Sequence, residues 1–462
     1  MSLIVIILLS TFLYKKITIN INKKNLFPLF IIASISGWMF YKLDSSKVWS
    51  KFSALGALYY KSPNAVSGEI DKLIEKVGTN KKFNPINIKY QSTSKLHAIA
   101  KGMNLIVVIM ESVRADNLFL YGYKRHTMPF LESLRDNMII SDNTYVTQDR
   151  SCKTMGSLML GIYPDPRYGC LTWDYRKLKS NDSFLKRLLD NNYSLYFSTT
   201  QHKGAGDNFV PFLKKITNNK ITIESIENFK QRSFAAYDEK ILSANLFEWI
   251  KKQKTPFAAF MWTQAAHMPY YSNYKPFKEN NEIDKYDNAI YDIDMMIKDL
   301  VTKLKQKGIL SNTMFLFFGD HGEAVGKNLD FGHGKTLNDY TIHIPFLIYQ
   351  PSIIKKEIHN NAMIQTKDIA STTLDMLGID NNLRQSENMF LKSRRDKIYL
   401  SNVYQTYKLG YTTKDITATY LVEKNRLFFN KGYIDGSTLA QKKELLSWYK
   451  YQTLYIDKKL KK

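Results

Sequence analysis

The chain has 462 residues, of which 44% are hydrophobic and 23% are charged. This length suffices for one large α/β domain with an additional element, and the composition excludes a chain that is disordered over most of its length. The net charge of +24 would suit nucleic acid, an anionic membrane surface or a phosphorylated substrate. No zinc-finger, RNA-binding or helix-turn-helix signature accompanies this charge, so we expect no nucleic-acid partner. A solvated, Lys-rich surface is the plain alternative.

Two apolar runs open the chain. They cover residues 3–14 and 26–41, and the basic segment between them holds four lysines and no acidic residue. Each run is shorter than the roughly 18 to 20 apolar residues that span a bilayer, but the second ends in aromatic side chains typical of the membrane interface. We therefore expect residues 1–43 to form a membrane hairpin with its lysines in the cytoplasm, which places the rest of the chain outside. A signal peptide is disfavoured because no basic residue precedes the first run, and two buried core helices are the other alternative.

The chain after the hairpin divides into three parts by composition. Residues 44–100 are polar and Lys-rich, which predicts a juxtamembrane linker with one amphipathic helix near 69–77. A catalytic domain is predicted over 101–393. The last part, 394–462, alternates strand-like pieces (KIYLSN, ATYLVEK, RLFFNKG) with a Lys-rich helix. We expect it to complete the catalytic domain or to form a small appended subdomain.

Buried-strand patterns recur through the predicted catalytic domain. They begin at Asn104 with NLIVVIM and return in YSLYFST, PFAAFMW, TMFLFFG and IPFLIY, with helical patterns between several of them. Continuous apolar strands separated by helices are typical of parallel sheets that are covered on both faces. The sequence therefore predicts an α/β fold with a central, mostly parallel sheet flanked by helices.

Polar side chains follow three of these strands at the point where each strand ends. Glu111 comes directly after NLIVVIM, His267 follows PFAAFMW, and Asp320 and His321 follow TMFLFFG. Because ligands bind beyond the carboxyl ends of such strands, these residues are candidates for one site. Carboxylate and imidazole groups are the donors that Zn²⁺ or Mn²⁺ accepts. The structural alternatives are an ion pair between Glu111 and Arg114 and a satisfied loop histidine at His267.

The segment CKTMGSLML, which follows Ser151, is predicted to form a helix that ends at Gly161. Ser151, at its start, is favoured simply as an N-cap residue. The same position also suits a nucleophile, because the amides of a helix start stabilise a phosphoryl group and a metal ion lowers the pKa of a hydroxyl. The only two cysteines, Cys152 and Cys170, would pair in an oxidising compartment. Two free buried thiols are the alternative.

Together these motifs resemble the alkaline phosphatase superfamily, in the branch that holds sulfatases, lipoteichoic acid synthases and the phosphoethanolamine transferases of lipid A or the lipopolysaccharide core. The segments that carry the resemblance are ESVRADNLFLYGYKRHTMPFL (111–131), AAHMPY, GDHGEAVGKNLDFGHG (319–334) and TKDIASTTLDMLGI (366–379). The first of these is most similar to the transferases. The resemblance implies the fold of that superfamily.

The resemblance also implies roles for the candidate residues. Glu111, Asp320 and His321 would bind the metal together with the nucleophile. His267 and His333 would bind the phosphoryl group, assist the leaving group or hold a second metal. We expect Lys335, which closes the FGHGK motif, to bind substrate beside these two histidines.

The resemblance places the nucleophile at Ser151, with Thr154 as the alternative. Ser151 lies 40 residues after Glu111 and ten before Gly161, which matches the family's spacing. A sulfatase would need the C/S-x-P-x-R pattern that directs formylglycine formation, whereas Ser151 is followed by Cys, Lys, Thr and Met. We therefore expect an unmodified hydroxyl nucleophile that serves phosphoryl transfer.

The function implied is that of a metal-dependent phosphoethanolamine transferase. It would move the head group from a phospholipid donor to a cell-envelope saccharide or lipid A through a covalent phosphoryl-enzyme. Zn²⁺ is the expected metal, with Mn²⁺ or Mg²⁺ as alternatives. We expect the protein in the bacterial inner membrane with its catalytic domain periplasmic or otherwise extracytoplasmic. The alternatives are a sulfatase-like phosphodiesterase or sulfuric ester hydrolase and a catalytically inactive membrane scaffold.

Overall fold

The computed structural model describes most of the chain after its N-terminal part. The described residues are 63–80, 83, 94–167, 178, 182–201, 209–224, 238–254, 256–326, 332–391, 395–403, 407–431 and 438–460. The chain divides after Tyr60 into two units, and all described residues belong to the second. The membrane hairpin predicted at 1–43 lies outside them. Within the described residues, no helix is long and apolar enough to cross a bilayer.

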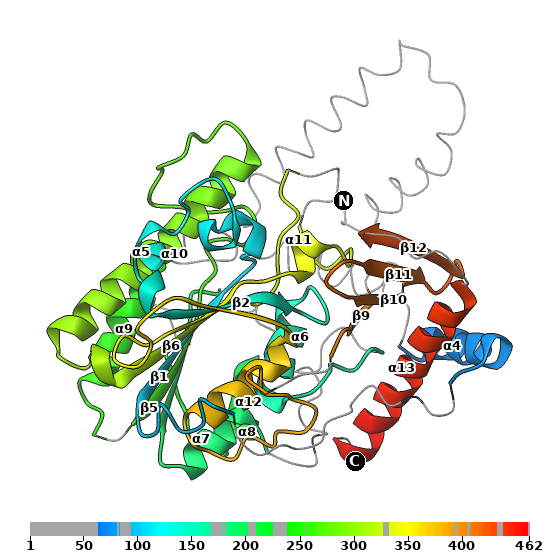
Figure 1. The fold of residues 1–462 in the computed structure, drawn as a ribbon, viewed down its shortest axis with the longest axis horizontal. Coiled ribbons are helices and arrows are strands. Elements are labelled where there is room, and N and C mark those ends of the chain that lie inside the picture. The colour runs from blue at the N-terminus through cyan, green and yellow to red at the C-terminus, as the bar shows by residue number, and fades with distance from the viewer. Residues whose placement is uncertain are drawn as a thin grey trace, which may run out of the picture. The chain divides into compact units, whose positions relative to one another are not determined.

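An eight-stranded sheet forms the centre of the described unit (Figure 1). Its strand order is β4-β3-β5-β1-β6-β7-β2-β8. The bounds are β1 Asn104–Met110, β2 Met138–Tyr145, β3 Ser194–Thr199, β4 Thr222–Glu224, β5 Phe257–Trp262, β6 Thr313–Gly319, β7 Phe346–Tyr349 and β8 Ile358–Gln365. All neighbouring pairs are parallel except the two that β7 makes with β6 and β2. The predicted α/β fold with a mostly parallel sheet is therefore confirmed.

Strand β7, predicted from IPFLIY, runs against its two neighbours. A parallel return needs a crossover of a dozen or more residues, usually a helix that packs on the sheet. The described part of the connection from β6 holds only the four-residue helix α11, Asp339–Ile342. Without a crossover helix there, the chain re-enters the sheet in the opposite direction.

Both faces of the sheet are buried, because alternate side chains of β1 and β6 enter two separate hydrophobic clusters. This explains why these strands read as continuous apolar runs. Helices cover each face (Figure 1). On one face lie α6 Ser151–Leu160, α7 Phe184–Asp190, α8 Phe209–Ile216 and α12 Thr366–Met376, and on the other lie α5 Pro129–Ser133, α9 Lys240–Ile250 and α10 Glu282–Gln306. Short 3-10 turns occur at Ala115–Asn117, Phe119–Tyr121, Arg135–Asn137 and Leu310–Asn312.

The ends of helix α10 are determined by its local sequence, and one of its side chains contacts the candidate site. Its N-cap Asn281 accepts a hydrogen bond from the backbone N–H of Asp284 at 3.0 Å. Lysines occupy the last turn, where a positive charge favours the helix dipole. The buried Tyr286 of this helix donates its hydroxyl to the carbonyl of Ser112 at 2.6 Å. Helix α10 thereby supports the turn that follows β1.

A second, antiparallel sheet follows the main one in the chain. Its order is β12-β11-β10-β9, with bounds β9 Ile398–Asn402, β10 Lys408–Thr412, β11 Thr417–Leu421 and β12 Arg426–Lys431. Its side chains form a third hydrophobic cluster with α13, Thr438–Lys459, and α4, Pro63–Val77. Helix α4 contains the stretch predicted as a linker helix, and its Ile70 is fully buried in this cluster. Strands β2, β4, β8 and β10 were not identified from the sequence.

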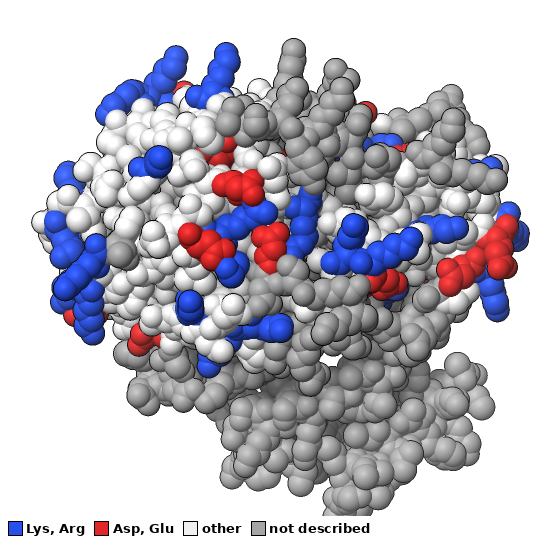
Figure 2. Space-filling view, turned by 90° about the horizontal axis from the view of Figure 1, so that it is seen from below, with Lys and Arg blue, Asp and Glu red and all other residues white. Residues whose placement is uncertain are grey.

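The charged surface is mixed in sign where it can be seen. On the face in Figure 2, Lys and Arg side chains lie scattered between acidic and uncharged ones. This face shows the scattered arrangement of basic residues that the linear sequence indicated.

Candidate active site

The carboxyl ends of β5, β1 and β6 bring the predicted residues together. Parallel pairing sets Ile109 of β1 opposite Trp262 of β5, and Met110 opposite Gly319 of β6. Glu111 and Asp320 are the next residues along β1 and β6, so they emerge at the same level of the sheet. Both side chains are buried.

Glu111 makes the contacts expected of a residue at the centre of the site. Its Oε2 accepts hydrogen bonds from Ser151 Oγ at 3.1 Å and from Trp262 Nε1 at 2.9 Å. Nε2 of His321 lies 3.5 Å from its Oε1. Burial, and then the charge of Asp320, raise the pKa of the Glu111 carboxyl well above its usual range.

The turn after β1 is held in a strained conformation. Ser112 has a φ of 60°, which non-glycine residues rarely adopt. Its backbone N–H donates to Asp320 Oδ1 at 2.8 Å, which links the turn to β6. Arg114, the alternative partner of Glu111, instead donates to the carbonyl of Glu323 at 2.7 Å and to the side chain of Asn117. The guanidinium group therefore stabilises the walls of the site.

Asp320 offers a carboxylate oxygen without a hydrogen-bond partner, and His321 offers a ring nitrogen that contacts Ser151. Asp320 Oδ1 accepts the backbone N–H groups of Ser112 and His321, while its buried Oδ2 has no hydrogen-bond partner. His321 Nδ1 lies 3.0 Å from the Gly322 carbonyl, so the ring carries its proton there and keeps a lone pair on Nε2. That Nε2 lies 3.0 Å from Ser151 Oγ. Burial lowers the pKa of His321 to about 4, which keeps the imidazole neutral.

These residues fit a divalent cation. A buried oxygen without a partner costs about 1 to 3 kcal/mol, and more when it is charged, unless a ligand satisfies it. Asp320 Oδ2 is such an atom, and a cation would also relieve the repulsion between the Glu111 and Asp320 carboxylates. Glu111, His321 and His333 each place one ligand atom so that all three lie within 4.8 Å of one another. Mixed oxygen and nitrogen donors suit Zn²⁺ or Mn²⁺.

Ser151 points its hydroxyl at this cluster. Helix α6 takes Arg150 as its N-cap, without a side-chain capping bond, so Ser151 is the first helical residue. Its Oγ bonds instead to Glu111 and lies beside His321. Thr154, the alternative nucleophile, sits one turn later, and its buried Oγ1 has no hydrogen-bond partner. The structure thus joins Ser151, and not Thr154, to the cluster.

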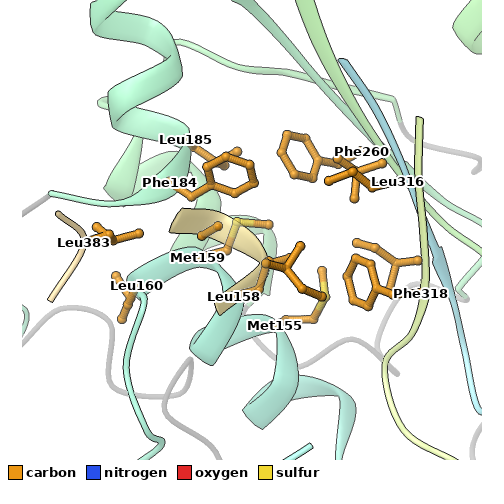
Figure 3. Close-up of a cluster of buried hydrophobic side chains, with 14 of the residues drawn as sticks. Met155, Leu158, Met159, Leu160, Phe184, Leu185, Phe260, Leu316, Phe318 and Leu383 are labelled. Atoms are coloured by element: carbon orange, nitrogen blue, oxygen red, sulfur yellow. The ribbon is translucent and has the colours of Figure 1, made fainter. Parts of the chain in front are cut away.

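The packing of α6 fixes where Ser151 lies. Figure 3 shows Met155, Leu158 and Met159 of this helix facing Leu316 and Phe318 of β6. All five side chains are fully buried. Because β6 also carries Asp320 and His321, one hydrophobic contact sets the distance between the hydroxyl and these two residues. Loss of this packing would separate them.

Three imidazole rings gather above the cluster. The ring centroid of His333 lies 4.0 Å from that of His321 and 5.3 Å from that of His267. His333 Nδ1 lies 3.3 Å from Oε2 of Glu323. His267 Nδ1 lies 2.7 Å from the Met268 carbonyl, which leaves its Nε2 as the acceptor atom. Burial, and then the charge of His267, lower the pKa of His333.

Lys335 and Cys152 complete the predicted set. Lys335 lies two residues after His333. Burial lowers the pKa of His333 most, the charge of His267 comes next, and the charge of Lys335 contributes less. Cys152 is disulfide-bonded. Its predicted partner, Cys170, lies outside the described residues, so the pairing stays a prediction.

Three residues of the site were not identified from the sequence. Trp262 is the last residue of β5, where an aromatic residue reads simply as part of an apolar strand. Glu323 follows His321 by two residues, and its place in the DHGE motif could have indicated that it belongs to the site. Burial raises the pKa of its carboxyl to about 7. Asp149 precedes helix α6, and burial also raises its pKa to about 7.

The fold is that of the alkaline phosphatase superfamily. The sulfatase family model matches residues 103–379, well over half of the chain. The protein therefore belongs to the sulfatase family and is an enzyme of this superfamily. The predicted resemblance is confirmed.

The curated relatives include a sulfatase and phosphoethanolamine transferases. An ulvan-active sulfatase of Formosa agariphila is 23% identical over 312 residues, which make up 62% of this chain and 56% of that protein. The phosphoethanolamine transferase EptA of Escherichia coli O157:H7 is 24% identical over 332 residues, 64% of this chain and 57% of that protein. The chain thus spans about half the length of these relatives.

Solved structures share the fold at low identity. The lipoteichoic acid synthase LtaP of Listeria monocytogenes has a TM-score of 0.61 and 17% identity, covering 84% of this chain and 98% of that one. The zinc complex of the C-terminal periplasmic domain of EcEptC from Escherichia coli has a TM-score of 0.52 and 16% identity, covering 68% and 92%.

Proposed function

We propose that this protein transfers a phosphoethanolamine-type head group from a phospholipid to a cell-envelope saccharide or lipid A, with Ser151 as the nucleophile. The observation that carries the proposal is the position of Ser151 Oγ, 3.1 Å from Glu111 Oε2 and 3.0 Å from His321 Nε2. This is where a hydroxyl would stand to share a cation with both residues. Similarity to EptA supports the choice of head group.

The reaction would proceed in two displacements. In the first, Ser151 loses its proton to bulk water, its Oγ bonds to phosphorus, and the bond from phosphorus to the glycerol oxygen breaks. His267, which takes up a proton from water at Nε2 beforehand, donates it to that oxygen, so that diacylglycerol leaves, while His333, whose pKa burial lowers, binds the phosphoryl group. In the second, the acceptor hydroxyl gives its proton to His267 and bonds to phosphorus. The bond to Oγ then breaks, and Ser151 regains a proton from water.

A divalent cation held by Glu111, Asp320, His321 and Ser151 would lower the pKa of the hydroxyl and neutralise charge on the phosphoryl oxygens. The donor set favours Zn²⁺, with Mn²⁺ or Mg²⁺ as alternatives. The zinc complex of the EcEptC domain supports this choice. Lys335 would add a positive charge beside the phosphoryl group.

A membrane setting follows from the donor. We propose that residues 1–43 anchor the chain in the inner membrane and that 44–100 connect this anchor to a periplasmic or extracytoplasmic catalytic domain, 101–393. Residues 394–462 would complete that domain. A phospholipid head group would then lie within reach of the site.

Hydrolysis is the second candidate function. The similarity to an ulvan-active sulfatase favours hydrolysis, because a sulfatase cleaves a sulfate ester with water. Ser151, without the Pro and Arg that follow a formylglycine precursor, argues against the sulfatase chemistry. A phosphodiesterase would use the same first displacement and differ only in the acceptor.

Product analysis with phosphatidylethanolamine vesicles tests the proposal. Diacylglycerol should appear with wild-type protein and with the matched control Thr154→Ala, which removes an unpartnered hydroxyl from the same helix. It should be absent with Ser151→Ala. Release that rises when a saccharide or lipid A acceptor is added supports transfer. Release of free phosphoethanolamine at the same rate without an acceptor would identify a hydrolase.

A further inference from the structure

A buried carboxylate joins three parts of the chain next to the nucleophile. Asp149 is fully buried, two residues before Ser151. Its Oδ2 accepts the backbone N–H of Gly334 at 2.8 Å, and its Oδ1 accepts Nδ2 of Asn402 at 2.8 Å. The side chain thus connects the nucleophile segment with the His333 loop and with the second sheet.

The loop that carries His333 rests on this carboxylate. Gly334 has a φ of 78°, and a Cβ added there would lie 3.2 Å from Nε of Arg150. The positive φ disfavours another residue, and the guanidinium group of Arg150 would have to shift slightly to admit a Cβ. The turn therefore docks closely on residues 149–150, and the hydrogen bond to Asp149 sets its height above Ser151.

The second sheet holds the other side of the carboxylate. Asn402 is the last residue of β9, and its side chain is buried. The neighbouring Ser401 donates its backbone N–H to the carbonyl of Thr147 at 3.0 Å. The end of β9 therefore runs along the segment that leads into α6. Asn402 offers an N–H donor to the Asp149 oxygen that the His333 loop leaves unused.

We propose that Asp149 and Asn402 form a positioning pair through which the second sheet sets the His333–Lys335 turn over Ser151. Asn402 orients the Asp149 carboxylate by binding Oδ1, so that Oδ2 faces the N–H of Gly334. The turn then holds His333 and Lys335 at a fixed distance from the nucleophile. The second sheet thereby serves the reaction without touching the substrate. The inference rests on the proposed function only for the identity of that substrate.

A reciprocal exchange tests the pair. Asn402→Asp sets two carboxylates against each other and should lower kcat about 10- to 100-fold, as is usual for residues that orient a catalytic group. The double variant Asp149→Asn, Asn402→Asp restores one amide and one carboxylate, and keeps an acceptor for Gly334. It should recover kcat to within about threefold of wild type, a recovery that a lost fold would not allow. The matched control is Ser401→Ala, whose buried hydroxyl has no hydrogen-bond partner.

Hydrogen exchange provides a readout that does not need turnover. The amide of Gly334 should exchange faster in Asn402→Asp and return to the wild-type rate in the double variant. If wild type shows this protection but no turnover of phosphatidylethanolamine, the proposed function fails and the pair stands. An unchanged exchange rate and kcat in Asn402→Asp, or no recovery in the double variant, would overturn the pair. Should Asn402→Asp not fold, Gly334→Ala strains the same turn at its positive φ and crowds Arg150, and it should give the same loss of kcat; a wild-type kcat in that variant would overturn the pair.

Discussion

Trp262 Nε1 donates a hydrogen bond to Glu111 Oε2 at 2.9 Å, between the ends of β5 and β1. Both side chains are buried, and the parallel register sets Trp262 opposite Ile109, two residues before Glu111. The indole thus fixes one carboxylate oxygen and leaves Oε1 facing His321, 3.5 Å from its Nε2. The rigidity of the sheet is transmitted through this bond to Glu111, the proposed metal ligand.

The change Trp262→Phe should therefore weaken metal binding about tenfold, because the carboxylate loses the group that orients it. The dissociation constant, measured by competition with a chelator, checks this. Trp249→Phe is the control. Trp249 packs against Tyr196 and Phe257 on one face of the sheet. Trp262 contacts Phe209 on the opposite face. Equal affinities in the two variants would show that the indole N–H does not orient Glu111.

Asp320→Asn should separate folding from metal binding. The amide keeps an oxygen for the N–H groups of Ser112 and His321 and places an NH₂ group where the unpartnered Oδ2 now lies. We expect the thermal midpoint of the metal-free protein to change little while metal affinity falls at least about 100-fold, since a charged ligand is lost. Retention of wild-type metal content after dialysis would exclude Asp320 as a ligand.

Glu239 should give the protein a distinct pH dependence. Its buried carboxylate accepts the backbone N–H groups of Gln264 and Ala265 at 2.6 Å each, and burial raises its pKa from 4.5 to about 8. Between these pH values the folded protein holds a proton that the unfolded chain has released. Its contribution to the free energy of unfolding is therefore present at low pH and is lost as the pH rises toward about 8.

The variant Glu239→Gln cannot ionise but keeps an acceptor oxygen for both N–H groups. The difference in the free energy of unfolding, wild type minus variant, should fall by at most about 1.4 kcal/mol per pH unit across this window. Denaturant unfolding at several pH values, with metal held in excess, measures it. A difference that does not change with pH would mean that Glu239 ionises normally in the folded protein.

The sequence predicted five of the eight strands of the main sheet and the polar residues at their carboxyl ends, because both depend on local patterns. NLIVVIM and TMFLFFG are continuous apolar strands, and a polar residue directly after such a strand must lie at its carboxyl end. Glu111, Asp320 and His321 were found in this way. The sequence placed Ser151 at the start of a helix as its N-cap residue. In the structure Arg150 is the N-cap, and Ser151 is the first residue of the helix.

The contacts that support these residues carry no local pattern. Asn402 follows Asp149 by 253 residues, and nothing near either residue indicates that they meet. Trp262 reads as part of a strand until the register of β5 against β1 is known. The direction of β7 likewise depends on its connection from β6, whose described residues hold no helix longer than the four-residue α11. Such features arise from tertiary packing, which a single sequence does not encode in its periodicity.

The most direct test of the account is to find where the phosphoryl group is attached. Metal-loaded protein would be incubated with phosphatidylethanolamine, reduced and digested with trypsin, which cleaves after Arg150 and Lys153 and so separates Ser151 from Thr154. We predict a mass increase of one phosphoethanolamine group on the peptide of residues 151–153. An adduct on the peptide that begins at Thr154, or no adduct on a protein shown to hold its metal and release diacylglycerol, would contradict the assignment of Ser151 as nucleophile.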